Sequence, residues 1–401
     1  MNTRSIERLK RADRYLGGPF LRLLTLARRP SPGDRDRTPD PGTVRSILMA
    51  KLWGIGNLVM ILPLVRGVRR AFPDARIFFL TLEENAALLA PVRAIDGLVL
   101  LKPEGVVRTL AALARTAREV RRLRPELFLD FEQFLRVTAI LARLSGAPFT
   151  VGFHTPGQSR AWGYTVKVPC PEREHMRLGF GKILHGAGIS TARLPLLEAP
   201  RSPAAARRAE EFLRAHTRGT GPLVALHPGS GDNFPGRRWP VERFARLARD
   251  LVLRAGARCV LTGSAAERPL VERCRALAGV PAVPAAGRLD LPAFIELLAR
   301  VDLLVTNDTA PAHIGAALGT PMVALYGPNT PERYGPLHPG ARVFHLGLPC
   351  SPCLTNANAK TSRCTSPECM LGIDAEDVFR AALELLESVK AERVPLRGEE
   401  S

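Results

Sequence analysis

The chain has 401 residues, of which 46% are hydrophobic and 24% charged, enough for two domains of ordinary size with a core in each. Its formal net charge of +19 indicates an acidic partner, which could be a nucleic acid, an anionic membrane surface or a phosphorylated substrate. A nucleic acid is disfavoured because the sequence has no zinc-finger, homeodomain or RNP pattern and no basic strand interleaved with aromatic residues.

Residues 5–29 form a basic amphipathic segment in which leucines and aromatic residues are set among arginines. Gly17, Gly18 and Pro19 are expected to break it into two short helices. The segment is too charged to span a bilayer and lacks a signal-peptide cleavage pattern, so we expect a cytoplasmic protein. Two placements stay open: the interface of an anionic membrane, on its cytoplasmic face, or packing on the protein's own domains. Residues 31–42, rich in Pro, Asp and Arg, are expected to be a linker.

Short apolar runs alternate with helical segments from residue 44 onward. This alternation is typical of mostly parallel, doubly wound α/β sheets. The charged, proline-rich stretch 194–205 separates two series of runs, which predicts two Rossmann-like domains facing a cleft, at 44–195 and 206–373. The runs are 45–51, 75–81, 97–101, 126–131 and 149–153 in the first series, and 223–227, 258–263, 302–306, 322–326 and 342–346 in the second.

The corner between the strand at 302–306 and a helix at 311–318 reads NDTAP. Asn, Asp and Thr favour helix N-termini, and Pro is tolerated in a first turn because it has no N–H to lose. Such a corner directs free N–H groups and the positive end of a helix dipole towards the carboxyl edge of the sheet, where a phosphate or diphosphate would bind. An ordinary strand-to-helix corner is the alternative. The candidate anion-binding residues are Asp308, Thr309, Ala310 and His313.

Other small or basic residues are predicted at the same edge. Gly229 and Ser230 follow the strand at 223–227 and would let the backbone approach a ligand. Thr262 and Gly263 end the next strand. Arg237 precedes the helix at 241–253, and its planar guanidinium suits phosphate oxygens, although a solvated surface arginine is the alternative.

Four of the seven cysteines are spaced C-x2-C, ten residues, C-x4-C near the end of the second domain. Tetrathiolate zinc sites use similar spacings. A structural zinc and a loop held by reduced or pairwise-bonded cysteines are both open. The residues are Cys350, Cys353, Cys364 and Cys369.

Three stretches together resemble glycosyltransferase family 9, the heptosyltransferases of bacterial lipopolysaccharide core assembly. They are GIGNLVMILPLVRGVRRAFPDARI, HPGSGDNFPGRRWPVERFARLARDL and NDTAPAHIGAALGTPMVALYGPNTPERYGP, in this order. The resemblance covers residues 44–390 and implies a GT-B fold, with an ADP-activated sugar donor in the C-terminal half and an acceptor in the N-terminal half. It also implies that a last helix, within 374–395, packs back on the N-terminal domain.

The implied reaction is an inverting transfer of a sugar, with heptose the first candidate, to a lipopolysaccharide-core or other glycan or lipid acceptor. The resemblance places donor phosphates at Arg237 and implies that no cofactor is required. Two competing interpretations are a GT-B sugar-nucleotide epimerase and a protein that binds a sugar nucleotide without transferring it.

The chain departs from the family in the turn after the first strand. The family usually has Gly-Asp there, and the aspartate is taken as the general base; this chain has Asn57, whose amide cannot accept a proton. Glu132, at the carboxyl end of the fourth strand, is our hypothesis for a replacement base, with Asp130 behind it. The alternative for Glu132 is a carboxylate favoured by a helix dipole.

Overall fold

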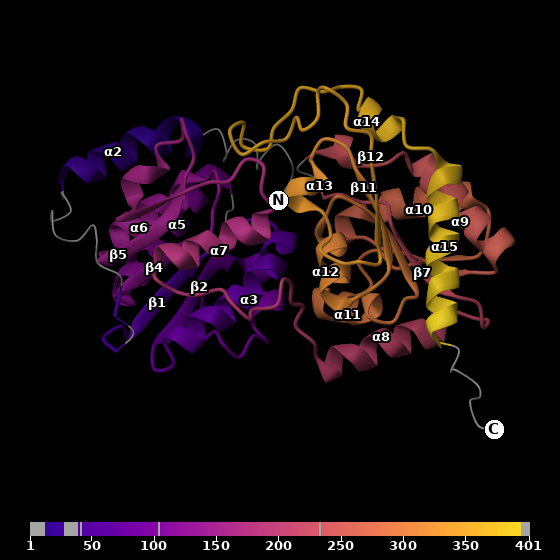
Figure 1. The fold of residues 1–401 in the computed structure, drawn as a ribbon, viewed down its shortest axis with the longest axis horizontal. Coiled ribbons are helices and arrows are strands. Elements are labelled where there is room, and N and C mark those ends of the chain that lie inside the picture. Colours follow the sequence, from indigo (N-terminus) through magenta and orange to yellow (C-terminus); the bar gives the residue numbers. More distant parts are fainter. Residues whose placement is uncertain (1–12, 28–38, 41, 103–104, 232–233, 394–401) are drawn as a thin grey trace. The chain divides into compact units, whose positions relative to one another are not determined.

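The computed structural model describes residues 13–27, 39–40, 42–102, 105–231 and 234–393 (Figure 1). The chain divides into two compact units. Unit 1 runs to Leu197 and also contains Leu354–Thr361, whereas unit 2 comprises Glu198–Cys353 and the residues from Ser362 onward. The change at Leu197 falls inside the predicted connection, but the return of Leu354–Thr361 to unit 1 has no counterpart in the sequence analysis.

Unit 1 contains a six-stranded parallel sheet in the order β3-β2-β1-β4-β5-β6. The five predicted runs are all strands, and β6 is an additional edge strand. The strands are β1 (Ser46–Ala50), β2 (Arg76–Leu82), β3 (Gly97–Leu101), β4 (Leu127–Asp130), β5 (Phe149–His154) and β6 (Val166–Pro169).

Helices cover this sheet. The helix α3 packs beside α7, and α6 packs beside α5 and the N-terminal α2. Leucine, valine and phenylalanine side chains from β1, β2, β4, α2, α5 and α6 form one buried cluster between these elements. The helical elements are α2 (Gly18–Ala27), α3 (Ile55–Ala71), η3 (Glu83–Asn85), α4 (Ala86–Leu89), α5 (Gly105–Arg122), α6 (Arg136–Ser145), η4 (Arg160–Gly163) and α7 (Met176–Gly186).

The N-terminal segment packs on unit 1 along one face. A short π-helical turn, η1 (Asp13–Gly17), runs directly into α2, so the helix type changes between Gly17 and Gly18 but the predicted break into two separate helices is not seen. Leu21 is completely buried, and the carboxylate of Asp13 accepts hydrogen bonds from the backbone N–H groups of Arg136 and Val137. Asp13 therefore caps α6, whose own N-cap residue is a leucine. The rest of the predicted amphipathic segment and most of the predicted linker lie outside the described residues.

The opposite face of this segment is apolar and exposed. Its side chains are between 46% and 70% exposed: Tyr15, Leu16, Phe20 and Leu23. None of the described helices is both long enough and apolar enough to cross a bilayer.

Unit 2 contains a second six-stranded parallel sheet in the order β12-β11-β10-β7-β8-β9. The five predicted runs are again strands, and the edge strand β9 is additional. The strands are β7 (Leu223–His227), β8 (Arg258–Leu261), β9 (Ala282–Pro284), β10 (Leu303–Asn307), β11 (Met322–Tyr326) and β12 (Ala341–His345).

Two groups of helices flank the second sheet (Figure 1). The first group is α9 (Val241–Ala255), α10 (Arg268–Ala278) and α15 (Ala375–Arg393), and the second is α8 (Pro203–His216), α11 (Leu291–Leu298) and α12 (Ala310–Leu318). Four shorter helical elements complete the unit: η5 (Pro235–Arg237), η6 (Ala265–Glu267), α13 (Pro331–Tyr334) and α14 (Glu368–Leu371).

The last helix, α15, belongs to unit 2. Val378, Phe379 and Ala382 are completely buried in the core that α9, β10 and β11 also line. The guanidinium of Arg254 lies 4.1 Å from the centre of the Phe379 ring. This corrects the expectation that the helix packs on the N-terminal domain: its apolar face is already used within unit 2.

Candidate active site

Asn307 joins three segments at the carboxyl edge of the second sheet. It ends β10 and is completely buried. Its side-chain oxygen accepts a hydrogen bond from the backbone N–H of Trp239 at 2.9 Å, and its amide nitrogen donates to the carbonyl oxygens of Pro228 and Gly229, each at 3.0 Å. The asparagine thus fixes the loop after β7 and the start of α9 against the strand end.

The helix α12 begins at this edge, one residue earlier than predicted. Its N-cap residue, Thr309, has an extended backbone, and its side chain makes no capping hydrogen bond. The first turn therefore keeps its N–H groups unblocked by the N-cap side chain, as an anion site requires. Pro311 occupies that turn and Gly319 closes the helix with a φ of 74°. His313 lies on α12 and is buried.

Arg237 carries the positive charge of this edge. Its guanidinium donates to the backbone carbonyls of Asp308 at 3.2 Å and Ser230 at 2.7 Å, which hold the side chain in place. Its Nε is buried and has no hydrogen-bond acceptor within the part of the chain that the structure describes. Across those same described residues, no ion pair joins Arg237 to a carboxylate. A fixed cation without a carboxylate partner is suited to bind an anion.

The loop after β7 is shaped by Glu267. The carboxylate accepts hydrogen bonds from the N–H of Gly231 and from the N–H and hydroxyl of Ser264, each at 2.9 Å. Burial acts to raise the pKa of Glu267, but the nearby His227 and these hydrogen bonds outweigh it and hold the pKa below its usual value. A Cβ on Gly229 would lie 2.1 Å from a Glu267 oxygen, so a larger residue there would displace this carboxylate.

The predicted donor residues therefore gather at one edge of unit 2. Arg237 contacts Ser230 and Asp308, and α12 starts two residues after Asp308. Thr262 lies one strand away, where its hydroxyl is 2.9 Å from Nδ1 of His227. Asn329, which the sequence analysis did not single out, donates to the Asp308 carboxylate at 2.7 Å. The full predicted set at this edge is Gly229, Ser230, Arg237, Thr262, Gly263, Asp308, Thr309, Ala310 and His313.

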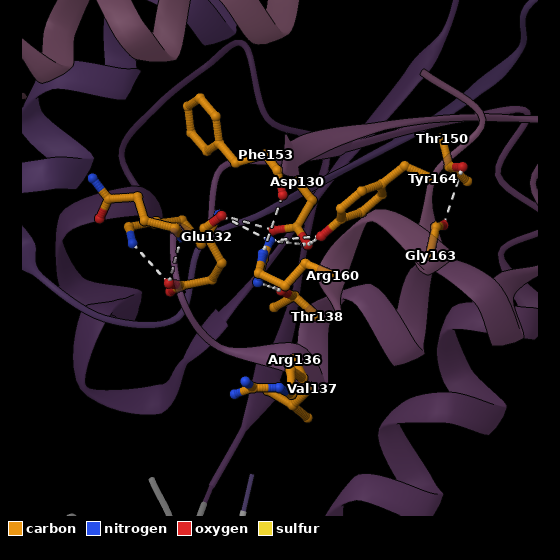
Figure 2. A network of polar contacts seen from close by, with 12 residues as sticks. Asp130, Glu132, Arg136, Val137, Thr138, Thr150, Phe153, Arg160, Gly163 and Tyr164 are labelled. Atoms are coloured by element: carbon orange, nitrogen blue, oxygen red, sulfur yellow. Dashed lines mark hydrogen bonds and ion pairs between the residues drawn. The ribbon is translucent and has the colours of Figure 1, made fainter. Parts of the chain in front are cut away.

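In unit 1, Glu132 is placed differently from a typical general base (Figure 2). It is completely buried; one carboxylate oxygen accepts from the N–H groups of Leu52 and Trp53, and the other lies 3.0 Å from Nζ of Lys51. Burial acts to raise the pKa of Glu132, but the Lys51 charge and these bonds outweigh it and lower the pKa. A carboxylate with both oxygens engaged and a lowered pKa is a poor proton acceptor. This geometry favours a positioning role over the hypothesis of a replacement base.

Asp130 is buried next to Glu132. It accepts hydrogen bonds from the Tyr164 hydroxyl at 2.5 Å and from the Arg160 guanidinium at 3.1 Å. Burial raises the pKa of Asp130 despite the opposing charge of Arg160. Asn57 lies in the first turn of α3. Lys51, Arg160 and Tyr164 were not predicted as site residues, because Lys51 ends a predicted strand and Arg160 and Tyr164 lie outside the predicted runs and motifs.

The four clustered cysteines do not fit a metal site. They are free thiols, with Cys350 and Cys364 exposed and Cys369 buried. Burial and the neighbouring thiols raise the pKa of Cys369 to about 11. Nowhere in the described ranges do three or more His, Cys, Asp or Glu side chains form a group able to hold a metal ion. The zinc interpretation is therefore not supported.

Comparison with known proteins gives one consistent family. The model of glycosyltransferase family 9 (heptosyltransferase) matches residues 113–362. A lipooligosaccharide heptosyltransferase 2 from Haemophilus influenzae is 34% identical over 134 residues, which cover 32% of this chain and 38% of that relative's length.

Solved structures agree with this match. The glycosyl transferase family 9 protein from Veillonella parvula has a TM-score of 0.72 at 25% identity and covers 88% of this chain and 99% of its own. The E. coli ADP-heptose lps heptosyltransferase II has a TM-score of 0.66 at 21% identity, covering 86% and 99%. With the two parallel six-stranded sheets, these likenesses confirm the predicted two-domain α/β GT-B fold.

Proposed function

The chain belongs to glycosyltransferase family 9, and from this premise we propose that it is an inverting glycosyltransferase. Its donor is a nucleoside-diphosphate sugar, ADP-linked and with heptose as the first candidate, and its acceptor is a lipopolysaccharide core or another glycan or lipid. The single observation that carries the proposal is Arg237, a fixed cation without a carboxylate partner that contacts Asp308 just ahead of the uncapped start of α12. The donor is also suggested by a solved structure of similar fold, which is named for ADP-heptose.

In the proposed reaction an acceptor hydroxyl attacks the anomeric carbon, and the bond from that carbon to the diphosphate breaks. Negative charge grows on the leaving diphosphate, where Arg237 and the N–H groups of Thr309 and Ala310 would stabilise it. These groups supply the stabilisation without a cofactor. Asp308 and His313 would hydrogen-bond the hydroxyl groups and phosphate of the donor.

Asn57 would orient the acceptor hydroxyl. Its amide oxygen can accept a hydrogen bond without taking the proton, which would pass to solvent. We therefore expect Asn57→Asp to raise kcat by about 10-fold or more, because a carboxylate adds general-base catalysis. Initial rates at pH 7 would measure this, and an unchanged or lower kcat would contradict the assignment.

The transfer itself is tested by mixing the protein with ADP-heptose and a heptose-free lipopolysaccharide-core acceptor. We expect release of ADP together with a mass increase of the acceptor by one heptose. An epimerase would alter the nucleotide sugar without acceptor, and a binding protein would hold it without product, so either result would overturn the proposal.

We further propose that the protein associates peripherally with the inner face of the cytoplasmic membrane. Leu16, Phe20 and Leu23 recur at i, i+4 and i+7 and are exposed, while Arg14 and Arg22 are exposed beside them. Apolar side chains flanked by arginines suit the interface of an anionic bilayer.

Sedimentation with vesicles of phosphatidylglycerol and phosphatidylcholine tests this association. Replacing Leu16, Phe20 and Leu23 with serine should weaken binding by about 10-fold or more, since each buried apolar side chain contributes about 1 kcal/mol or more. Leu253→Ser is the matched control, because Leu253 is 70% exposed on α9 of unit 2 and should leave binding unchanged. Equal binding of the triple variant and the wild type would refute the proposed surface.

A further inference from the structure

The turn between β1 and α3 is held by a side chain from a distant part of the chain. The N–H groups of Leu52 and Trp53 both donate to one oxygen of Glu132, at 2.9 Å and 3.0 Å. Gly54 follows with a φ of 95°, a conformation that favours glycine, and a Cβ there would lie 2.8 Å from the Asn57 side-chain nitrogen. The path of the turn, and with it the start of α3 at Ile55, therefore depends on Glu132.

The second oxygen of Glu132 neutralises a buried cation. Nζ of Lys51 lies 3.0 Å away, and the side chains of both residues are at most 1% exposed. Neither charge can be removed alone without leaving the other buried and unpaired, which is costly. The pair therefore has one favoured arrangement.

The backbone of Glu132 is itself hydrogen-bonded to Asp130 and Arg160 (Figure 2). Its N–H donates to Asp130 at 2.8 Å, and its carbonyl accepts from Arg160 at 2.7 Å. Arg160 and the Tyr164 hydroxyl both bind the far oxygen of Asp130. Through its side chain and its backbone, Glu132 thus joins one buried network of five residues: Lys51, Asp130, Glu132, Arg160 and Tyr164.

Close backbone approaches fix the remote end of this network. A Cβ on Gly152 would lie 2.3 Å from the Tyr164 ring, so the ring lies directly against the backbone of β5. A Cβ on Gly163 would lie 2.6 Å from the carbonyl oxygen of Ala139 in α6. Since both glycines allow contacts that no other residue would, the network is anchored to the sheet and to α6.

We infer that Lys51 and Glu132 are positioning residues: through their ion pair and the two N–H bonds, they hold the β1–α3 turn so that Asn57 meets the acceptor hydroxyl. The inference rests on the proposed function for its effect on the reaction, but the hold on the turn is independent of it. The residues behind them, Asp130, Arg160 and Tyr164, keep Glu132 in place.

The matched control for Glu132 is Glu296 in unit 2. Its side chain is 2% exposed, and it too accepts from a backbone N–H, that of Ser202 at 3.0 Å, and pairs with a cation, Arg201 at 2.7 Å. It has no place in the proposed active site. If weakened folding alone lowers kcat, the loss of kcat should therefore appear in both Glu132→Gln and Glu296→Gln.

We expect Glu132→Gln to lower kcat by about 100-fold, the order of loss that misplacement of a reacting group causes, while the donor KM stays within about 2-fold. Glu296→Gln should keep kcat. The pH dependence of kcat should keep its shape in Glu132→Gln, because a positioning residue does not exchange the reacting proton; loss of one limb of the profile would instead identify Glu132 as the base and overturn the inference. Equal kcat in the two variants would overturn it as well.

Amide hydrogen exchange separates this inference from the proposed reaction. Glu132→Gln should speed exchange at residues 52–57, and Glu296→Gln should not, whether or not the protein transfers a sugar. Should Glu132→Gln fail to fold, Tyr164→Phe removes a single hydroxyl from the network and should give a smaller change in the same direction. If amide exchange at residues 52–57 is unchanged in whichever of these two variants folds, the inference is overturned, even if sugar transfer is observed.

Discussion

Replacing Arg237 with methionine lowers kcat/KM of the proposed transfer by about 1,000-fold and weakens ADP binding by about 100-fold. Methionine keeps most of the apolar stem but removes the cation that lies next to the start of α12. Each charge-assisted hydrogen bond to a phosphate is worth about 2 kcal/mol, and two such bonds would be lost. Initial rates and calorimetric titration with ADP measure the two effects.

Arg249→Met is the matched control for this change. Arg249 also donates to two backbone carbonyls, those of Ala278 at 2.8 Å and Leu277 at 2.7 Å, but lies away from the β10 and α12 edge. We expect it to keep full activity. Arg237→Lys should give an intermediate loss of about 10-fold, because an ammonium retains the charge without the planar fork. Similar losses for Arg237→Met and Arg249→Met would remove Arg237 from the donor site.

Replacing Asn307 with aspartate should destabilise unit 2 by about 4 kcal/mol at pH 7. The change exchanges an NH2 group for an oxygen that faces the carbonyls of Pro228 and Gly229, to which the asparagine donates at 3.0 Å. The new carboxylate would be completely buried and repelled by the two carbonyl acceptors. Chemical denaturation measures the difference in free energy of unfolding from the wild type.

The effect should depend on pH in a defined direction. Burial raises the folded-state pKa of the introduced carboxyl above its unfolded value of about 3.9. Below pH 4 the carboxyl is protonated in both the folded and the unfolded state and can donate to one carbonyl. The loss in free energy of unfolding relative to the wild type is therefore small. It grows as the pH rises from 4 to the folded-state pKa, and stays constant above it.

Asn358→Asp provides the control for this prediction. The side-chain oxygen of Asn358 accepts from the N–H of Thr355 at 3.0 Å, a role that a carboxylate also fills. We expect a change of less than about 1 kcal/mol. An equally small loss of stability for Asn307→Asp would show that the hydrogen bonds of Asn307 do not stabilise the edge. A large loss that does not shrink in acid would show that the buried charge is not its cause.

The sequence predicts every inner strand of the two sheets and two of their four edge strands. All ten predicted runs are strands. Eight of them are inner strands, which in parallel sheets are buried on both faces and need unbroken apolar sequence, and the other two, β3 and β12, are edge strands. The missed strands, β6 and β9, are both at sheet edges. They are short and contain a proline each, and β6 also contains a lysine, so neither carries the apolar signal of an inner strand.

The candidate site residues, too, were predicted only in part. The corner at Asp308 and Thr309 was predictable because capping preferences act over a few neighbouring residues. The partner of Glu132 was not, because it is 81 residues away in Lys51. Only the pairing of β1 with β4, with Ala50 opposite Asp130, places the residues after the two strands side by side. The local sequence therefore suggested that Glu132 is a general base, whereas its long-range contacts indicate a positioning residue.

The short return of the chain into unit 1 bears on any attempt to dissect the protein. Leu354 is 3% exposed there, and the carbonyl of Asn356 accepts from the Gln158 amide at 2.6 Å. A gene truncated after codon 197 would encode a first half that lacks Leu354–Thr361. The apolar surface that Leu354 covers would then be exposed to solvent. A split version of the enzyme would need that octapeptide grafted onto the first half through a new connection.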